Sequence, residues 1–106
     1  MNGEIELIKH IVFWKLHDYA EGKSMDENMD YITKEVLAIK EEFPLLRKVK
    51  CNKSINRGNQ FWDYALEMEF DTLKDLEKYQ VYPRHQKLHE YAVKVRKDRA
   101  VVDYEF

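Results

Sequence analysis

The first predicted element is a β-strand over residues 5–16, in which large apolar side chains fall on both faces. In the stretch IELIKHIVFWKL, alternate residues point to opposite sides of an extended chain. Val12 and Trp14 then share one face, and Ile11 and Phe13 share the other. Because both faces carry apolar groups, the strand is expected to be covered on both sides.

Apolar residues recur at spacings of three and four along residues 24–43, which predicts an amphipathic helix. Ser24 and Glu27 have the spacing of a capping box at its start, and Pro44 ends it. The apolar stripe consists of Met25, Met29, Ile32, Val36, Ile39 and Phe43.

Residues 45–55 and 61–70 are predicted to form a hairpin around a turn at residues 56–59. The lysines of the first strand are typical of a sheet edge, where charge discourages pairing with other chains. The second strand alternates strictly, and one of its faces carries Trp62, Tyr64, Leu66, Met68 and Phe70.

Two helices and a strand are predicted in the remaining chain. A short helix covers residues 73–80, Pro83 begins a helix that continues to Asp98 with a basic last turn, and a strand follows at residues 100–106. This order of elements predicts a ferredoxin-like α+β domain, with an antiparallel sheet and its helices on one face. The uncovered face, which bears Ile11 and Phe13, predicts contact with a second subunit.

The composition of the chain limits the classes of binding partner and the cellular compartment that we expect. The chain has 106 residues, which predicts a single domain over residues 1–106. Mixed charges and a formal net charge of -2 indicate no general attraction to nucleic acid or an anionic membrane. No apolar run is long enough for a transmembrane helix. Cys51 is the only cysteine, which excludes an internal disulfide and a cysteine metal cluster and favours a cytoplasmic protein.

Three segments, IKHIVFWKL, YQVYPRHQ and RAVVDYEF, resemble the stress-responsive dimeric α/β-barrel family in their order and spacing. The resemblance covers nearly the whole chain. It implies a ferredoxin-like subunit and a homodimer in which two subunits pack sheet to sheet into a dimeric α/β barrel. Members of the family differ in function: some are stress-induced proteins, and a plant member catalyses an aldol cyclisation of a linear polyketide without a cofactor.

The resemblance also implies a set of candidate catalytic residues. Tyr79 and His85, six positions apart, match a tyrosine and a histidine that flank the pocket of the plant cyclase. His10 and Asp103 match a histidine of the first strand and an aspartate of the last strand in the same enzyme. We therefore expect these four side chains to meet between the helices and the sheet.

Two positions depart from the family's pattern and affect the expected shape of the pocket. Tyr82 stands where members usually carry a second histidine, and Asn52 stands where a glycine is common. The expected lining of the pocket is Val12, Trp14, Trp62, Tyr64, Leu66, Met68 and Tyr82.

The candidate residues suit acid–base chemistry without a cofactor. Asp103 can accept a hydrogen bond from one nitrogen of His85 and fix its tautomer, so that the other nitrogen acts as a general base toward an acidic carbon. Tyr79 can hydrogen-bond the resulting enolate oxygen. A structural alternative is that His85 and Asp103 only satisfy each other as buried polar groups. In another alternative, His85 and His89 hold a metal ion, for which the sequence marks no third ligand.

The sequence therefore predicts a protein that binds a small, largely apolar, oxygen-bearing molecule, and its most concrete form is cyclase-like acid–base chemistry. One alternative is a non-catalytic dimeric protein linked to stress tolerance. Another, which rests on the shared barrel alone, is a cofactor-free monooxygenase. No cofactor and no resident metal are expected.

Overall fold

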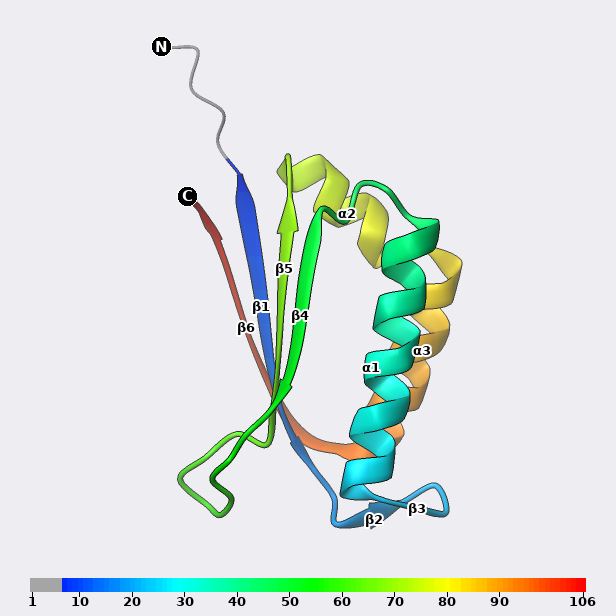
Figure 1. The fold of residues 1–106 in the computed structure, drawn as a ribbon, viewed down its shortest axis with the longest axis vertical. Helices are drawn as coiled ribbons and strands as arrows, with labels where there is room; N and C mark the ends of the chain where they lie inside the picture. Colours follow the sequence, from blue (N-terminus) through cyan, green and yellow to red (C-terminus); the bar gives the residue numbers. More distant parts are fainter. Residues whose placement is uncertain (1–6) are drawn as a thin grey trace.

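The computed structural model describes residues 7–106, so Ile5 and Glu6 of the first predicted strand lie outside the described residues. The elements follow the predicted order, with a small additional hairpin before the first helix (Figure 1). They are β1 (Ile8–Leu16), β2 (Tyr19–Ala20), β3 (Lys23–Ser24), α1 (Met25–Glu42), β4 (Lys48–Lys53), β5 (Tyr64–Phe70), α2 (Leu73–Gln80), α3 (Pro83–Val95) and β6 (Arg96–Glu105).

The main sheet has the strand order β4-β5-β1-β6, and every neighbouring pair is antiparallel. The helices α1, α2 and α3 all lie on one side of this sheet (Figure 1). The predicted ferredoxin-like α+β fold with helices on one face is confirmed, and the lysine-rich strand β4 is an edge strand as expected. Among residues 7–106, none of the helices combines the length and the apolar character needed to cross a membrane.

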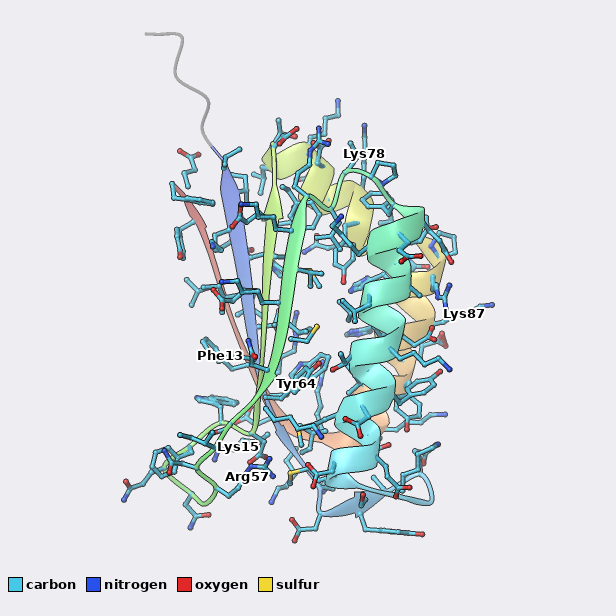
Figure 2. All side chains as sticks on the ribbon, in the orientation of Figure 1. Phe13, Lys15, Arg57, Tyr64, Lys78 and Lys87 are labelled. Carbon is cyan, nitrogen blue, oxygen red and sulfur yellow. The ribbon has the colours of Figure 1, made fainter. Side chains whose placement is uncertain are left out.

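Burial along β1 alternates residue by residue, which assigns its two faces. Val12 and Trp14 are 4% and 6% exposed and face the helices, whereas Ile11 and Phe13 are half-buried on the opposite face. Figure 2 shows Tyr64 of β5 pointing from the sheet toward the helices, while Phe13 lies on the other side. The core between sheet and helices includes Ile8, Leu16, Met29, Ile32, Val36, Ile39, Leu46, Leu66, Met68, Phe70, Leu76, Leu88 and Val95.

The last helix ends earlier than predicted, and the last strand begins earlier. Helix α3 stops at Val95 and β6 starts at Arg96, although the sequence predicts a helix to Asp98 and a strand from residue 100. The charged run RKDR has no apolar periodicity of its own, so pairing with β1 decides its conformation. Leu16 lies opposite Arg96, and the backbone groups of this segment are satisfied by the sheet.

The hairpin β2–β3 was not predicted, and a buried asparagine holds it. Asn28 of α1 is fully buried, and its Nδ2 donates to the carbonyl oxygens of Ala20 at 3.1 Å and Lys23 at 3.5 Å. Tyr91 of α3 donates its hydroxyl hydrogen to Asn28 Oδ1. One side chain therefore ties the hairpin and both long helices together.

We expect Asn28→Ala to lower the free energy of unfolding by about 2 kcal/mol, because it removes these hydrogen bonds and leaves buried groups without partners. Urea denaturation measures the change. Asn52→Ala on the exposed edge strand is the control and should change stability by less than about 0.5 kcal/mol. Equal effects of the two substitutions would contradict the proposed role of Asn28.

Candidate functional site

A small cavity lies between the helices and the sheet, and it contains most of the predicted site residues. Its volume is about 30 Å³. Of the predicted residues, it is lined by His10, Val12, Trp14, Leu66, Met68, Tyr79 and His85. The other lining residues are Val36, Leu88, His89, Ala92, Arg96 and Arg99.

Four predicted residues do not line this cavity. Tyr64 stacks on Trp14 with a ring-centroid distance of 5.9 Å, and its hydroxyl bonds Thr33 of α1. Tyr82 hydrogen-bonds Glu42 at 2.9 Å on the outer side of the helices. Trp62 packs on the opposite face of the sheet. Asp103 does not line the cavity itself but contacts the lining residue His10.

The cavity adjoins an outer groove, with which it shares lining side chains. The groove has a volume of about 500 Å³, and it shares His85, His89 and Arg99 with the cavity. A volume of about 30 Å³ is that of one water molecule, whereas pockets for whole drug-sized ligands measure about 300–1,000 Å³. The cavity therefore takes only a terminal group of a ligand, and the groove offers room for the rest. The remaining groove residues are Gln80, Gln86 and Glu90.

The tautomer of His85 is set by the end of helix α2. Its Nδ1 lies 3.1 Å from the carbonyl oxygen of Gln80, the last residue of α2. A carbonyl oxygen only accepts hydrogen bonds, so Nδ1 carries the proton and Nε2 of the neutral ring has a free lone pair. Pro83 begins α3 three residues later and needs no hydrogen-bond partner for its own nitrogen.

Asp103 pairs with His10, so the predicted hydrogen bond between Asp103 and His85 is wrong. His10 and Asp103 are directly opposite each other in the β1–β6 ladder, and their side chains share the helix face. The distance from His10 Nδ1 to Asp103 Oδ1 is 2.5 Å, and His10 is only 4% exposed. The fixed register of two neighbouring strands thus decides the partner of Asp103.

Burial favours the neutral forms of the His85 imidazole and the Tyr79 phenol. Burial lowers the pKa of the His85 imidazole; the hydrogen bond to Gln80 opposes this shift and the nearby His89 adds to it. Burial also raises the pKa of the Tyr79 phenol. The two rings are in contact, with centroids 4.3 Å apart. The site therefore places an unprotonated base beside a protonated hydroxyl.

A β-bulge places two arginines beside this pair. Trp14 lies opposite Arg99 and Leu16 lies opposite Arg96, so β6 has one more residue than β1 between these two pairs. Side chains three positions apart in a regular strand point to opposite faces, but the bulge puts both arginines on the helix face. The sequence does not predict their position at the site, because the charged run RKDR fits the end of a helix and no local pattern marks the bulge.

The arrangement gives little support to a metal site at His85 and His89. Their ring centroids are 6.4 Å apart. Within residues 7–106, no group of three His, Cys, Asp or Glu residues is arranged to hold a metal ion.

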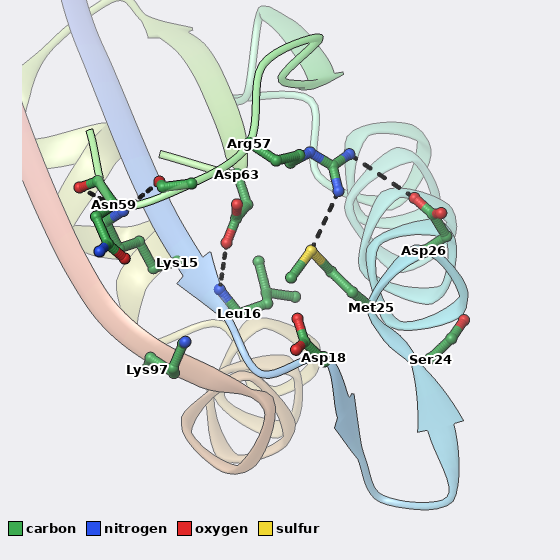
Figure 3. A pocket seen from close by; sticks show the side chains of 11 residues that line it. Lys15, Leu16, Asp18, Ser24, Met25, Asp26, Arg57, Asn59, Asp63 and Lys97 are labelled. Atoms are coloured by element: carbon green, nitrogen blue, oxygen red, sulfur yellow. Dashed lines mark hydrogen bonds and ion pairs between the residues drawn. The ribbon is translucent and has the colours of Figure 1, made fainter. Parts of the chain in front are cut away.

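A second, polar groove of about 470 Å³ lies beyond the end of β1 (Figure 3). Lys15 Nζ reaches the carbonyl oxygens of Gly58 and Asn59, each at 3.3 Å. Asp63 accepts a hydrogen bond from the Leu16 backbone nitrogen at 2.9 Å. These polar groups already have protein partners that hold the loop after β4, so the groove is better explained as a structural feature than as a binding site.

Comparisons with known proteins identify one family. The profile of the family described as "Stress responsive A/B Barrel Domain" matches residues 8–106. A comparison with curated protein sequences finds no significant match.

Solved structures also match over most of the chain. A dimeric protein of unknown function with a ferredoxin-like fold from Bacteroides fragilis is 30% identical, with a TM-score of 0.79, and the match covers 94% of this chain and 96% of that one. A dimeric ferredoxin-like protein of unknown function from Thermobifida fusca is 16% identical, with a TM-score of 0.80 and coverage of 95% and 92%. The hydroxynitrile lyase of Passiflora edulis is 15% identical, with a TM-score of 0.78 and coverage of 97% and 95%. The last two likenesses concern the fold alone.

The partly buried side chain of His85 predicts a pH dependence of stability. The folded-state pKa of His85 is lowered from its usual value of about 6.5, so the unfolded chain binds more protons below that pH and stability is lost as the pH falls. We expect the melting temperature of the wild type to decrease between about pH 7 and about pH 5, and that of His85→Gln to decrease less. The exposed His17→Gln is the control, and it should keep the wild-type slope; identical slopes for all three proteins would contradict the expectation.

Proposed function

The chain belongs to the stress-responsive A/B barrel family, and from this premise we propose that it binds a small oxygen-bearing molecule at the His85 cavity and acts on it by acid–base chemistry without a cofactor. The observation that carries the proposal is the hydrogen bond from His85 Nδ1 to the Gln80 carbonyl. It directs the basic Nε2 away from the helix end, beside a neutral phenol in a largely buried cavity.

The proposed step is proton abstraction from a carbon next to a carbonyl group. Nε2 of His85 takes the proton, the C–H bond breaks, and its electron pair moves to the carbonyl oxygen as an enolate. Tyr79 lines the cavity and remains protonated, so its hydroxyl is available to donate to that oxygen. The imidazolium that forms donates from Nδ1 to the last carbonyl of α2, where the helix dipole favours positive charge.

The volumes of the site limit the substrate. A cavity of about 30 Å³ admits one small group of the substrate, and the groove of about 500 Å³ has room for the remainder of the molecule. This favours a small substrate over a long polyketide enclosed beneath the helices. One protein of the same fold is named a hydroxynitrile lyase, and that name also denotes chemistry on a small oxygenated compound.

The proposal predicts that the protein exchanges carbon-bound hydrogen. In deuterated buffer, the wild type should catalyse deuterium incorporation next to the carbonyl of at least one of acetone, acetoacetate and acetoacetamide, measured by proton NMR. His85→Gln should lose about 100-fold or more of this rate, because it lacks the base. His17→Gln is the matched control and should keep the rate. Equal exchange by His85→Gln and the wild type, or by neither above buffer, would refute the proposal.

The second candidate function, a non-catalytic dimeric role in stress tolerance, is favoured by the small volume of the cavity. It predicts no exchange with any of the compounds. Among residues 7–106, no feature favours the cofactor-free monooxygenase over these two functions.

The open face of the sheet supports assembly with a second copy of the chain. Phe13 packs against Trp62 there with ring centroids 6.4 Å apart, and Tyr104 packs against Phe106 at 6.2 Å. Val102 is 50% exposed on the same face. Two matching structures, including the one at 30% identity, are described as dimeric. We propose that two copies pack sheet to sheet through this face to form the barrel.

We expect Phe13→Asp to raise the dissociation constant of the dimer by about tenfold or more, because it places an unpaired charge in an apolar interface. Sedimentation velocity over a concentration series measures the association. Leu37→Asp on the outer surface of α1, where the side chain is 48% exposed, is the control. A wild-type protein that sediments as a monomer at micromolar concentration would contradict the proposal.

A further inference from the structure

Two buried hydrogen-bond donors on residues that line the cavity have no acceptor within residues 7–106. They are Nε1 of Trp14 and Nη1 of Arg96, and both residues line the cavity. Trp14 as a whole is only 6% exposed. Buried donors nearly always have partners in folded proteins, since an unsatisfied one is destabilising. A pair of them at one cavity wall therefore indicates a place where an acceptor binds.

The positive charge of Arg96 and Arg99 indicates that the acceptor is an anion. The bulge brings Arg99 onto the same face as Arg96, opposite Trp14. Within residues 7–106, neither guanidinium forms an ion pair with a carboxylate. The pKa of Arg96 is lowered by burial and by Arg99, which is the expected result for a cation that has a like charge and no counter-ion. Of the carboxylates around this wall, Asp103 bonds His10, and Asp98 accepts a hydrogen bond from the backbone nitrogen of Arg99 at 2.8 Å. Glu90 lines the outer groove together with Arg99 but forms no ion pair with it.

We propose that the cavity binds the carboxylate of an oxo acid at the wall formed by Trp14, Arg96 and Arg99, with oxygens accepting hydrogen bonds from Trp14 Nε1 and from the two guanidinium groups. This inference rests on the proposed function and names its substrate class. A carboxylate has lone pairs for several donors, and it matches the planar donor fork of arginine. It also neutralises charge, which a ketone or an ester oxygen does not.

The size and the entrance of the cavity agree with a carboxylate. The volume of about 30 Å³ is too small for a phosphate with its four oxygens but admits a carboxylate oxygen. Arg99 is shared with the outer groove and is exposed, so it meets an incoming anion first. With the carboxylate inside, the rest of the oxo acid has room to extend past His85 and His89, which line both the cavity and the groove.

The chain offers a direct spectroscopic test, because it contains only two tryptophans. In a ¹H–¹⁵N spectrum, titration with acetoacetate should shift the indole N–H signal of Trp14 and leave that of Trp62, which packs on the opposite face of the sheet, unchanged. Acetoacetamide has the same shape without the charge and is the matched ligand control. It should shift the Trp14 signal only at concentrations about tenfold higher or more.

Three substitutions on one strand separate the roles of the cations. Arg96→Gln and Arg99→Gln should each weaken acetoacetate binding by about tenfold or more. Lys97→Gln removes the same charge at the extra residue of the bulge, which lines the other groove, and should leave binding within about twofold. Melting temperatures of the three variants show that each is folded.

The outcomes distinguish this inference from the proposed function. Deuterium exchange with acetoacetamide and acetone, combined with an unmoved Trp14 signal at saturating acetoacetate, would overturn the carboxylate site and leave the acid–base function standing. A Trp14 shift that depends on Arg96 and Arg99 supports the carboxylate site even where no exchange occurs. Equal weakening by Lys97→Gln and Arg96→Gln would overturn it, because only general surface charge would then be acting.

Discussion

The antiparallel pairing of β1 with β6 is the interaction on which the rest of the structure depends. It joins the two ends of the described chain, where Leu7 and Phe106 exchange backbone hydrogen bonds of 3.1 and 2.9 Å. The same ladder sets His10 opposite Asp103 and Trp14 opposite Arg99. A slip of one residue in this register would turn the side chains of β6 to the wrong face. The apolar core and the polar wall of the cavity are therefore two consequences of a single pairing.

The junction of α2 and α3 supplies the other half of the site by a local mechanism. A helix leaves its last carbonyl groups without intrahelical partners, and His85 satisfies the one at Gln80. The partner of the histidine is thus a neutral backbone group, whereas a carboxylate would favour the imidazolium more strongly. Burial then determines the charge state, and the ring is kept as a neutral base. Asp103 acts elsewhere, on His10, so the two histidines of the cavity are oriented by different kinds of partner.

The elements with strong periodicity could be predicted from the sequence, and those determined by tertiary pairing could not. The alternation in β1 and β5 and the capping box of Ser24 and Glu27 are local signals, and each appears as expected. The early start of β6 and its bulge have no local signal, because charged residues such as Lys97 fit a helix end as well as a strand. The partner of Asp103 depends on the register between strands far apart in sequence. Similarly, Tyr64 has the right spacing for a pocket residue, but its hydroxyl bonds Thr33 of α1 and the residue does not line the cavity.

The charges around His85 connect ligand binding to its basicity. His89, His10 and Arg99 each lower the pKa of His85, in addition to burial. A carboxylate bound beside Arg96 and Arg99 would offset this positive charge and move the pKa of His85 back toward its usual value. The base would then be strongest when an anionic substrate is present, and a neutral compound in the same cavity would not have this effect. By linkage, protonation of His85 and binding of the anion would favour each other to the same degree. The positive wall created by the bulge would thus determine both which molecules bind and how readily the histidine accepts a proton from them.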